Sequence, residues 1–375
     1  MKRKALVLVA ALATVSSYAQ EAADGAAKPS SRAQATAIIA NARKILTPDG
    51  IERLEKIRLG GIEQWVSIRG VDRRNPVLVV IHGGPGYVDM PMSWWFGRGW
   101  EEYFTVVYWD QRAAGKTYLL TDAEAIRPTL TVERMVADAE ELVAWVRKDL
   151  KKDKVFVLGH SWGSYPGILI AQRHPQWLHA YIGVGQLSNG PEGERRSWSD
   201  TLAVARKAGN AQAVSELEAL APYAPNSAPL PIATILAERK WVARLGGTMA
   251  YRADNDADSD LADLSPDYTD EESRRIWDGN RFATPILLPQ ILSRDLAVQE
   301  LKVPLIVLAG RYDTNVDSNA VADWFAKVRA PQKHFVWFEH SAHMPMTEEP
   351  GKFLVSLVNY ARPIAARAGD VAPAQ

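Results

Sequence analysis

The clearest pattern along the chain is a set of short apolar runs that do not alternate with polar residues. Such runs occupy residues 77–81, 105–109, 155–158, 181–184, 303–309 and 334–338. A continuous apolar run is typical of a strand that is buried on both faces of a parallel sheet. Between residues 131 and 150, apolar positions recur every three or four residues, which indicates an amphipathic helix. Strands that alternate with helices predict an α/β fold with a mostly parallel sheet and helices on both faces.

The alternation stops after residue 187 and resumes near residue 298. The residues between are charged and helix-like, so we predict that 188–297 form a helical cap inserted into a core of 57–187 and 298–365. A hairpin that turns at Gly60-Gly61 is expected where the core begins. Residues 20–56 are expected to form an N-terminal extension and 366–375 a loose tail. Helices are expected at 35–46, 203–220, 232–245, 271–277 and 352–361.

A strand, a tight turn and a helix meet at residues 155–171. The turn is Gly159-His160-Ser161-Trp162-Gly163, which in this context matches a nucleophile elbow. Such a turn holds the serine in a strained backbone so that its hydroxyl stands clear of the sheet. The glycines two residues before and after the serine remove Cβ atoms that would clash. Ser161 is therefore the candidate nucleophile.

Two later strands lead into segments that carry the other groups of a catalytic triad. A serine hydroxyl needs a base to accept its proton, and a histidine base needs a carboxylate to fix its tautomer. Asp313 follows the strand at 303–309, and His343 follows the strand at 334–338. The chain order Ser161, Asp313, His343 is the one expected when all three lie at carboxyl ends of strands. Asp317 is the alternative acid and His340 the alternative base.

The remaining histidines and a row of aspartates are predicted to be structural. His82 and His160 lie within loop motifs and are expected to support backbone geometry. The seven histidines are scattered, so we predict no metal site and no cofactor. A calcium loop needs glycine and glutamate at positions where this chain has neither, so an alternating acidic stretch in the cap is predicted to be a solvated loop. Its members are Asp254, Asp256, Asp258 and Asp260.

Charge and cysteine content narrow the classes of function. Lys plus Arg and Asp plus Glu each number 44. No excess of positive charge therefore attracts nucleic acid or acidic lipid. The absence of cysteine excludes a thiol nucleophile, and a core of this size needs no disulfide. The expected partner is a small peptide or another small molecule, and the oligomeric state stays open.

The first residues match a targeting segment. Lys2-Arg3-Lys4 is basic, residues 5–15 are apolar apart from Thr14, and Ser17-Tyr18-Ala19 has the small residues of a cleavage site. The apolar run is too short to span a bilayer. We therefore expect a cleaved signal peptide at residues 1–19, no membrane segment after cleavage, and a periplasmic or secreted protein.

Three motifs in order resemble the proline iminopeptidase (prolyl aminopeptidase) branch of the α/β-hydrolases. They are His82-Gly83-Gly84-Pro85-Gly86, Asp110-Gln111-Arg112 and Gly159-His160-Ser161-Trp162-Gly163-Ser164. The segments around Asp313 and His343 also fit, and the similarity covers about 60–185 and 300–360. The resemblance implies an α/β-hydrolase fold with a helical cap, and hydrolysis of an N-terminal residue, typically proline, from a small peptide. It also implies that Gly84 and Trp162 supply the oxyanion N–H groups, as the elbow geometry itself favours, with Gly83 as the competitor for the first.

The chain departs from this family at two places. Ala113 and Thr117 replace a glycine and the serine of the family's Asp-Gln-Arg-Gly-x-Gly-x-Ser segment. In the cap, Leu245 stands where the family often has a glutamate that holds the substrate's free amine. Four other acidic residues of the cap are candidates for that role: Glu192, Glu194, Glu238 and Asp278.

Three functions are compatible with these observations. The first is an exported serine aminopeptidase of proline-iminopeptidase type. The second is an esterase, lactonase or amidase acting on a neutral small molecule. The third is a binding protein without catalytic activity, against which the complete serine, aspartate and histidine set argues. An acidic group in the pocket decides between the first two, because a buried ammonium without a counter-charge is costly.

The targeting segment gives a first prediction. Export from a bacterial host should remove residues 1–19 and leave Gln20 as the first residue, because the small residues before Gln20 fit a signal-peptidase site. The intact mass of the exported protein measures the cleavage point. A mature protein that retains Met1 would contradict this prediction.

Overall fold

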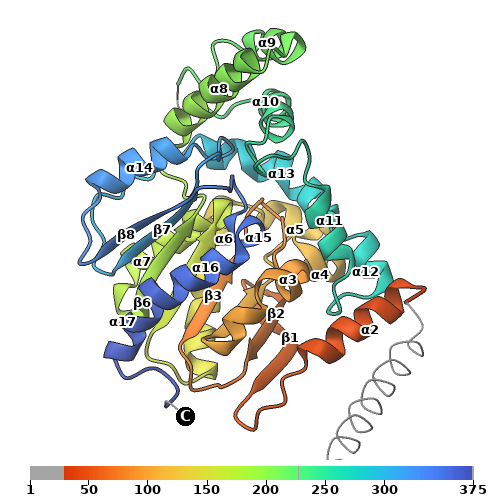
Figure 1. The fold of residues 1–375 in the computed structure, drawn as a ribbon, viewed down its shortest axis with the longest axis vertical. Coiled ribbons are helices and arrows are strands. Elements are labelled where there is room, and N and C mark those ends of the chain that lie inside the picture. Colours follow the sequence, from red (N-terminus) through yellow and green to blue (C-terminus); the bar gives the residue numbers. More distant parts are fainter. Residues whose placement is uncertain (1–28, 227, 374–375) are drawn as a thin grey trace, which may run out of the picture.

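The computed structural model describes residues 29–226 and 228–373 (Figure 1). The predicted signal peptide at 1–19 lies outside the described residues. Within them, eight strands form one sheet in the order β1-β2-β4-β3-β5-β6-β7-β8. The strands are β1 (Ile51–Leu59), β2 (Ile62–Gly70), β3 (Val77–Ile81), β4 (Thr105–Trp109), β5 (Val155–His160), β6 (Leu178–Val184), β7 (Leu305–Gly310) and β8 (Lys333–Phe338). β2 pairs antiparallel with both β1 and β4, and all other pairs are parallel, so the predicted mostly parallel sheet is confirmed.

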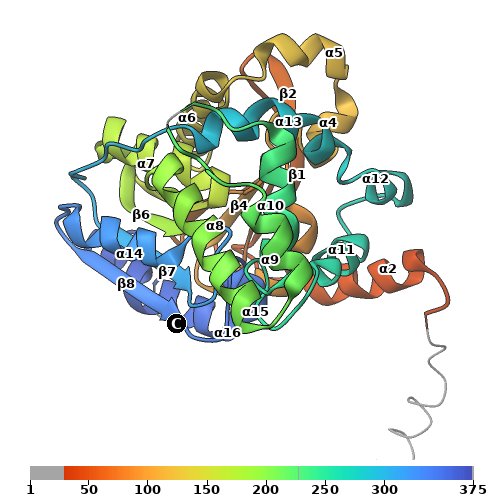
Figure 2. The same cartoon turned by 90° about the horizontal axis from the view of Figure 1, so that it is seen from above.

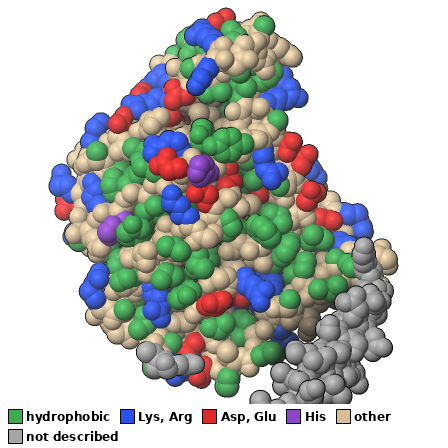
Figure 3. Space-filling model, in the orientation of Figure 1, with side chains coloured by type: hydrophobic (Ala, Val, Ile, Leu, Met, Phe, Trp, Pro, Cys, Tyr) green, Lys and Arg blue, Asp and Glu red, His purple; other side chains and the backbone are tan. Residues whose placement is uncertain are grey.

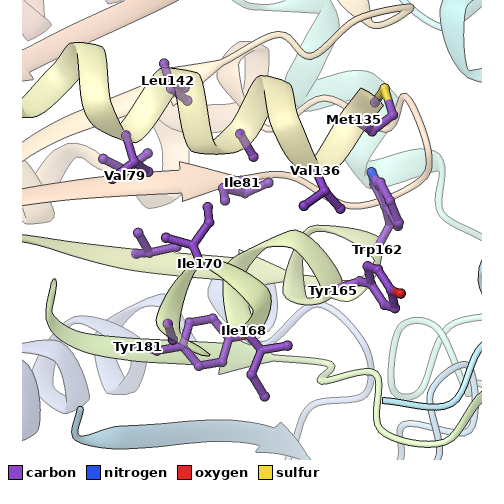
Figure 4. Close-up of a cluster of buried hydrophobic side chains, with 14 of the residues drawn as sticks. Val79, Ile81, Met135, Val136, Leu142, Trp162, Tyr165, Ile168, Ile170 and Tyr181 are labelled. Carbon is purple, nitrogen blue, oxygen red and sulfur yellow. The ribbon is translucent and has the colours of Figure 1, made fainter. Parts of the chain in front are cut away.

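Helices cover both faces of the sheet. One face packs against α6 (Val132–Asp149), α7 (Ser164–Arg173) and α14 (Ser318–Lys327), and the other against α3 (Ser93–Phe96), α16 (Pro350–Ser356) and α17 (Arg362–Arg367). Successive side chains of a strand point to opposite faces. Val79 and Ile81 of β3 accordingly pack between α6 and α7 (Figure 4), whereas Leu78 and Val80 pack on the opposite side. This two-sided burial explains why the central strands read as continuous apolar runs.

The first hairpin is longer than predicted. β1 begins at Ile51, six residues before the expected start of the core at residue 57. β1 is an edge strand, and its exposed and partly buried residues alternate, so it lacks the continuous apolar run of the central strands. The turn at Gly60-Gly61 is as predicted, and both residues have positive φ. The extension also packs on the fold, because Arg43 of α2 (Arg32–Arg43) pairs with Glu101 at 3.3 Å.

The predicted cap is helical and lies over the end of the sheet where β7 terminates (Figures 1 and 2). Its helices are α8 (Gly190–Lys207), α9 (Ala211–Glu218), α10 (Ile232–Arg244), α11 (Asp256–Asp263), α12 (Asp270–Arg274) and α13 (Asp278–Leu292). The single helix expected at 203–220 is wrong. It is two helices, because Gly209 takes a positive φ and Asn210 caps the next helix at Ala213.

Two other expectations about exposed segments are also wrong. The acidic stretch in the cap is not a solvated loop, because residues from Asp256 onward form α11 and the side chain of Asp258 is fully buried. The tail expected to be loose from residue 366 is held to the core. His179 Nε2 lies 2.9 Å from the carboxylate of Asp370, which also pairs with Lys152. Both errors come from long-range contacts that a local charge pattern does not reveal.

The surface shows no separation of charge on the face seen in Figure 3. Basic and acidic side chains are interspersed there, in agreement with the balanced composition. Among residues 29–226 and 228–373, no helix combines the length and the hydropathy needed to span a bilayer.

Candidate active site

Ser161 lies at the junction of β5 and α7 with a φ of +52°. L-residues avoid this left-handed conformation, so surrounding contacts must enforce it. A Cβ atom at Gly163 would lie 2.0 Å from the carbonyl oxygen of Ile81, and one at Gly159 would lie 2.4 Å from the carbonyl oxygen of Gly163. Only glycine fits at either position, so the turn that carries Ser161 packs tightly against the end of β3. This is the geometry of a nucleophile elbow.

His343 and Asp313 are brought together from the loops after β8 and β7. The Nδ1 atom of His343 lies 2.8 Å from Oδ2 of Asp313, and both side chains are buried. The other carboxylate oxygen of Asp313 accepts the backbone N–H of Val316 at 2.8 Å, which fixes its orientation. Asp317 instead caps α14 through the N–H of Ala320, and His340 is exposed. The geometry therefore favours Asp313 and His343 over their alternatives.

His343 is positioned by two contacts that the sequence analysis missed. Its backbone N–H donates to the carbonyl oxygen of Thr248 in the cap at 2.9 Å. Its ring packs against Gly185, where an added Cβ would lie 2.7 Å from Cε1 of His343. Gly185 directly follows β6 and has a φ of +50°. In the sequence, the sign of this contact was a glycine directly after a predicted buried strand.

The two loop motifs before the elbow form one hydrogen-bond network around Gln111. Its backbone N–H donates to Nε2 of His82 at 3.2 Å, and its side-chain amide donates to the carbonyl oxygen of His82 at 2.8 Å. The indole N–H of Trp162 donates to Oε1 of Gln111 at 3.0 Å. Gln111 thus ties the glycine-rich loop to the residue after Ser161. Gly83, Gly84 and Trp162 all line the cavity in front of the serine. Gly83 and Gly84 therefore both remain candidates for the oxyanion N–H group that acts together with that of Trp162.

His82 and His160 fulfil the predicted structural role. Because Nε2 of His82 accepts a hydrogen bond, its Nδ1 carries the proton and donates to the carbonyl oxygen of Gly83 at 2.8 Å. Nε2 of His160 lies 3.0 Å from the carbonyl oxygen of His343. Burial lowers the pKa of His82 to about 4 and that of His160 to about 3. Both rings are therefore neutral at pH 7 and leave proton transfer to His343.

The departures from the family motif preserve the local structure. Ala113 has a φ of +60°, the left-handed conformation that glycine adopts more readily. The hydroxyl of Thr117 donates to the carbonyl oxygen of Asp110 at 2.7 Å and accepts the N–H of Trp65 at 2.9 Å. A serine hydroxyl could make the same bonds. Arg112 forms a buried ion pair with Asp138 at 2.8 Å, which anchors the motif to α6.

The cavity in front of Ser161 has a volume of about 370 Å³. Cap and core both contribute apolar walls, formed by Leu187, Leu236, Ala243, Leu288, Ile291, Leu292, Val316 and Met344. Its polar walls include Tyr87, Asn255, Asn280, Thr284 and Arg239. Among the described residues that line it, Arg239 is the only Lys or Arg, and no Asp or Glu is present. A small substrate with one apolar group fits these dimensions.

The four acidic candidates of the cap separate into two pairs. Glu192 and Asp278 form surface ion pairs with arginines, away from the cavity. Glu194 and Glu238 are buried, and both bond to Arg239, whose side chain reaches the cavity. Burial raises the pKa of Glu238 to about 7, although Arg239 opposes the shift. Leu245 ends α10 and packs beside the apolar cluster around Trp241.

A second pair of buried acids was missed by the sequence analysis. The hydroxyl of Tyr87 donates to Oδ2 of Asp258 at 2.9 Å, and Asp89 follows two residues after Tyr87. Burial, and then the negative charges of Asp258 and Asp110, raise the pKa of Asp89 to about 8. Burial also raises the pKa of Asp258 to about 6. No metal-binding group of three His, Cys, Asp or Glu side chains occurs within the described ranges.

A family model for the alpha/beta hydrolase fold matches residues 76–350. The chain belongs to the α/β-hydrolase fold family. It is 27% identical over 318 residues to a protein of Bacillus subtilis (strain 168) named probable aminopeptidase YbaC, a match that covers 82% of this chain and 96% of the relative. It is 25% identical over 292 residues to a proline iminopeptidase of Clostridium botulinum, covering 74% and 86%. Both relatives resemble this α/β-hydrolase over most of their length.

The fold also matches solved structures. The proline iminopeptidase-related protein of Thermus thermophilus aligns with a TM-score of 0.58 at 20% identity, and the match covers 87% of this chain and all of that one. At that identity the likeness concerns the fold alone. The expected α/β-hydrolase fold and the resemblance to proline iminopeptidases are thereby confirmed.

The arrangement suits acyl transfer through a covalent intermediate. Ser161 and His343 line the same cavity, so His343 is the candidate base for the Ser161 proton, and Asp313 is the candidate that stabilises the resulting imidazolium. Gly83, Gly84 and Trp162 line the same cavity, and their backbone N–H groups are the candidates for stabilising the charge that develops on the carbonyl oxygen. In this scheme Ser161 is the nucleophile, His343 is the base, and the backbone N–H groups stabilise the oxyanion.

The elbow geometry predicts that Ser161 is the acylated residue. Ser161→Ala should lower kcat by roughly four orders of magnitude or more, without loss of fold, because the nucleophile is removed and the turn is retained. A fluorophosphonate probe followed by peptide mass analysis should locate the label on Ser161. An active preparation that is labelled elsewhere, or not at all, would refute the assignment.

The packing of Gly185 predicts a second effect on catalysis. Gly185→Ala should displace the His343 ring and lower kcat on the order of 100-fold, since small misplacements of a catalytic group are costly. Gly193→Ala in α8 is the matched control, because an added Cβ there meets nothing within 4 Å. Equal activity of the two variants would show that the contact at Gly185 does not position the base.

Proposed function

We propose that this protein is an exported serine aminopeptidase of proline-iminopeptidase type. It removes an N-terminal proline or similar residue from small peptides through an acyl-enzyme on Ser161. The observation that carries this proposal is the charge around the cavity. Besides Asp313, three buried carboxyl groups bond to residues of its wall: Glu194 and Glu238 bond to Arg239, and Asp258 accepts the hydroxyl of Tyr87, while Asp89 is buried two residues after Tyr87.

The excess of acidic groups suits a cationic substrate. Like charges in a poorly solvated site raise one another's pKa, and a nearby cation reverses that shift. Burial is the main cause of the raised pKa values of Glu238 and Asp89, and neighbouring carboxylates add to it, so an ammonium nearby would stabilise the charged form of both acids. A peptide with a free N-terminus brings this ammonium to the atom next to the scissile carbonyl. A neutral ester has no ammonium, so these acidic groups do not stabilise its binding.

The proposed catalytic cycle uses the side chains gathered at the cavity. Ser161 Oγ attacks the carbonyl carbon while His343 takes its proton, and the tetrahedral oxyanion is held by backbone N–H groups. His343 then gives the proton to the departing peptide amine, which leaves the N-terminal residue as an ester on Ser161. Water, activated by the same histidine, hydrolyses that ester. The apolar wall is suited to the pyrrolidine ring of proline.

The second candidate is a hydrolase of neutral esters, lactones or amides. It is favoured by the apolar walls and by the lack of an Asp or Glu among the described residues that line the cavity. Leu245 also stands where the related enzymes often have the amine-binding glutamate. Both candidates use the same acyl-enzyme, so only the preference for a charged amine separates them.

Matched substrates test the proposed function. Proline 4-nitroanilide should be hydrolysed with a kcat/KM at least about 100-fold higher than its N-acetylated form, because acetylation removes the cation that the acidic groups require. A short-chain 4-nitrophenyl ester reports the acyl-enzyme chemistry independently of the amine. Similar rates with and without the acetyl group, or turnover of the ester alone, would replace the aminopeptidase with the esterase.

A further inference from the structure

The cavity wall formed by Tyr87 and Asn255 stands in front of buried oxygens that lack a donor. Oδ1 of Asn255, Oδ1 of Asp258 and both carboxylate oxygens of Asp89 have no hydrogen-bond partner among the described residues. Asp258 follows Asn255 by three residues, and its other oxygen accepts the hydroxyl of Tyr87 at 2.9 Å. Asn255 and Tyr87 both line the active-site cavity. Acceptors without a donor therefore lie both at the cavity wall, in Asn255, and behind it, in Asp258 and Asp89.

Such a group of acceptors points to a missing donor. Buried polar atoms are almost always hydrogen-bonded, and each exception calls for a ligand, a water or an ion. Asp89 is only 2% exposed, and neither of its oxygens has a partner. Tyr87 is held by stacking on Trp277 at a centroid distance of 4.6 Å, so a tyrosine rearrangement is not available to fill the gap. A donor that enters through the cavity meets Asn255 first, because Asn255 lines it.

The charge at this wall shows what kind of donor fits. Within the described ranges, no Lys, Arg or His lies within 4 Å of the carboxylates of Asp89 or Asp258. Arg252, the cation that most lowers the pKa of Asp258, is exposed on the surface. On the cap side, by contrast, Arg239 already pairs with both Glu194 and Glu238. The uncompensated acids are therefore those behind Tyr87 and Asn255.

We propose that the free α-amine of the substrate binds at the wall formed by Tyr87 and Asn255. Its N–H groups donate to Oδ1 of Asn255, and Asp258 and Asp89 supply the counter-charge from behind. This inference rests on the proposed aminopeptidase function and assigns its specificity to residues other than the cap glutamates. The ligand class is a small primary or secondary ammonium next to the scissile carbonyl. An acetylated amine leaves the same oxygens without a cation.

Removing one charge tests this assignment. Asp258→Asn should lower kcat/KM for proline 4-nitroanilide by at least about tenfold, mainly through KM, because the ammonium loses part of its counter-charge. Hydrolysis of the 4-nitrophenyl ester, which has no amine, should fall much less, and circular dichroism shows whether the variant folds. Asp256→Asn is the matched control, since it removes an exposed charge from the same first turn of α11.

A second variant keeps the test decisive if Asp258→Asn does not fold. Asn255→Ala removes the acceptor at the wall and should reduce the preference for the free amine over the acetylated form. If the wild type shows that preference and the variants that fold retain it, the inference is overturned but the aminopeptidase stands, and loss of the preference in Glu238→Gln would then place the amine at the cap. If the wild type shows no preference at all, the proposed function fails and the inference fails with it.

Discussion

The site depends on the close contact between the elbow and the end of β3. β3 and β5 are parallel neighbours, with Ile81 opposite Gly159, so the turn at Ser161 is pressed onto the carbonyl oxygen of Ile81. Glycines at 159 and 163 permit that approach, and the serine accepts a left-handed backbone as its consequence. The loop that follows Ile81 is then necessarily beside the serine. One strand pairing thereby places the nucleophile and the glycine-rich loop together.

The other functional groups are held to this contact by a small number of buried hydrogen bonds. Gln111 links His82 to the indole of Trp162, and His160 links the elbow to the backbone of His343. Buried hydrogen bonds of this kind favour one arrangement, because breaking them leaves further polar groups unpaired. The cap takes part through Thr248, which accepts the N–H of His343. Catalytic geometry and cap position are therefore linked.

The buried acidic groups behind the cavity wall distinguish this site from a purely apolar pocket. The residues that line the cavity are mostly apolar, yet buried acids stand immediately behind them on two sides. On the cap side Arg239 compensates the acids, whereas behind Tyr87 no described Lys, Arg or His forms an ion pair with them. A wall of neutral acceptors with charge behind it can hold a cation and still admit an apolar ring. The departure at Leu245 is then compatible with a charged substrate.

The sequence by itself determined the sheet, the elbow and the order of Ser161, Asp313 and His343, because these depend on local patterns: continuous apolar runs, paired glycines and strand-end positions. It did not reveal the first six residues of β1, whose partial exposure removes the apolar run, or Gly185, whose importance lies in a contact with His343. It misjudged Asp258, since an aspartate in an acidic stretch is usually solvated. Only the tertiary structure decided which charges are buried and which of them share a cation, because the burial of a charged side chain depends on residues distant in sequence.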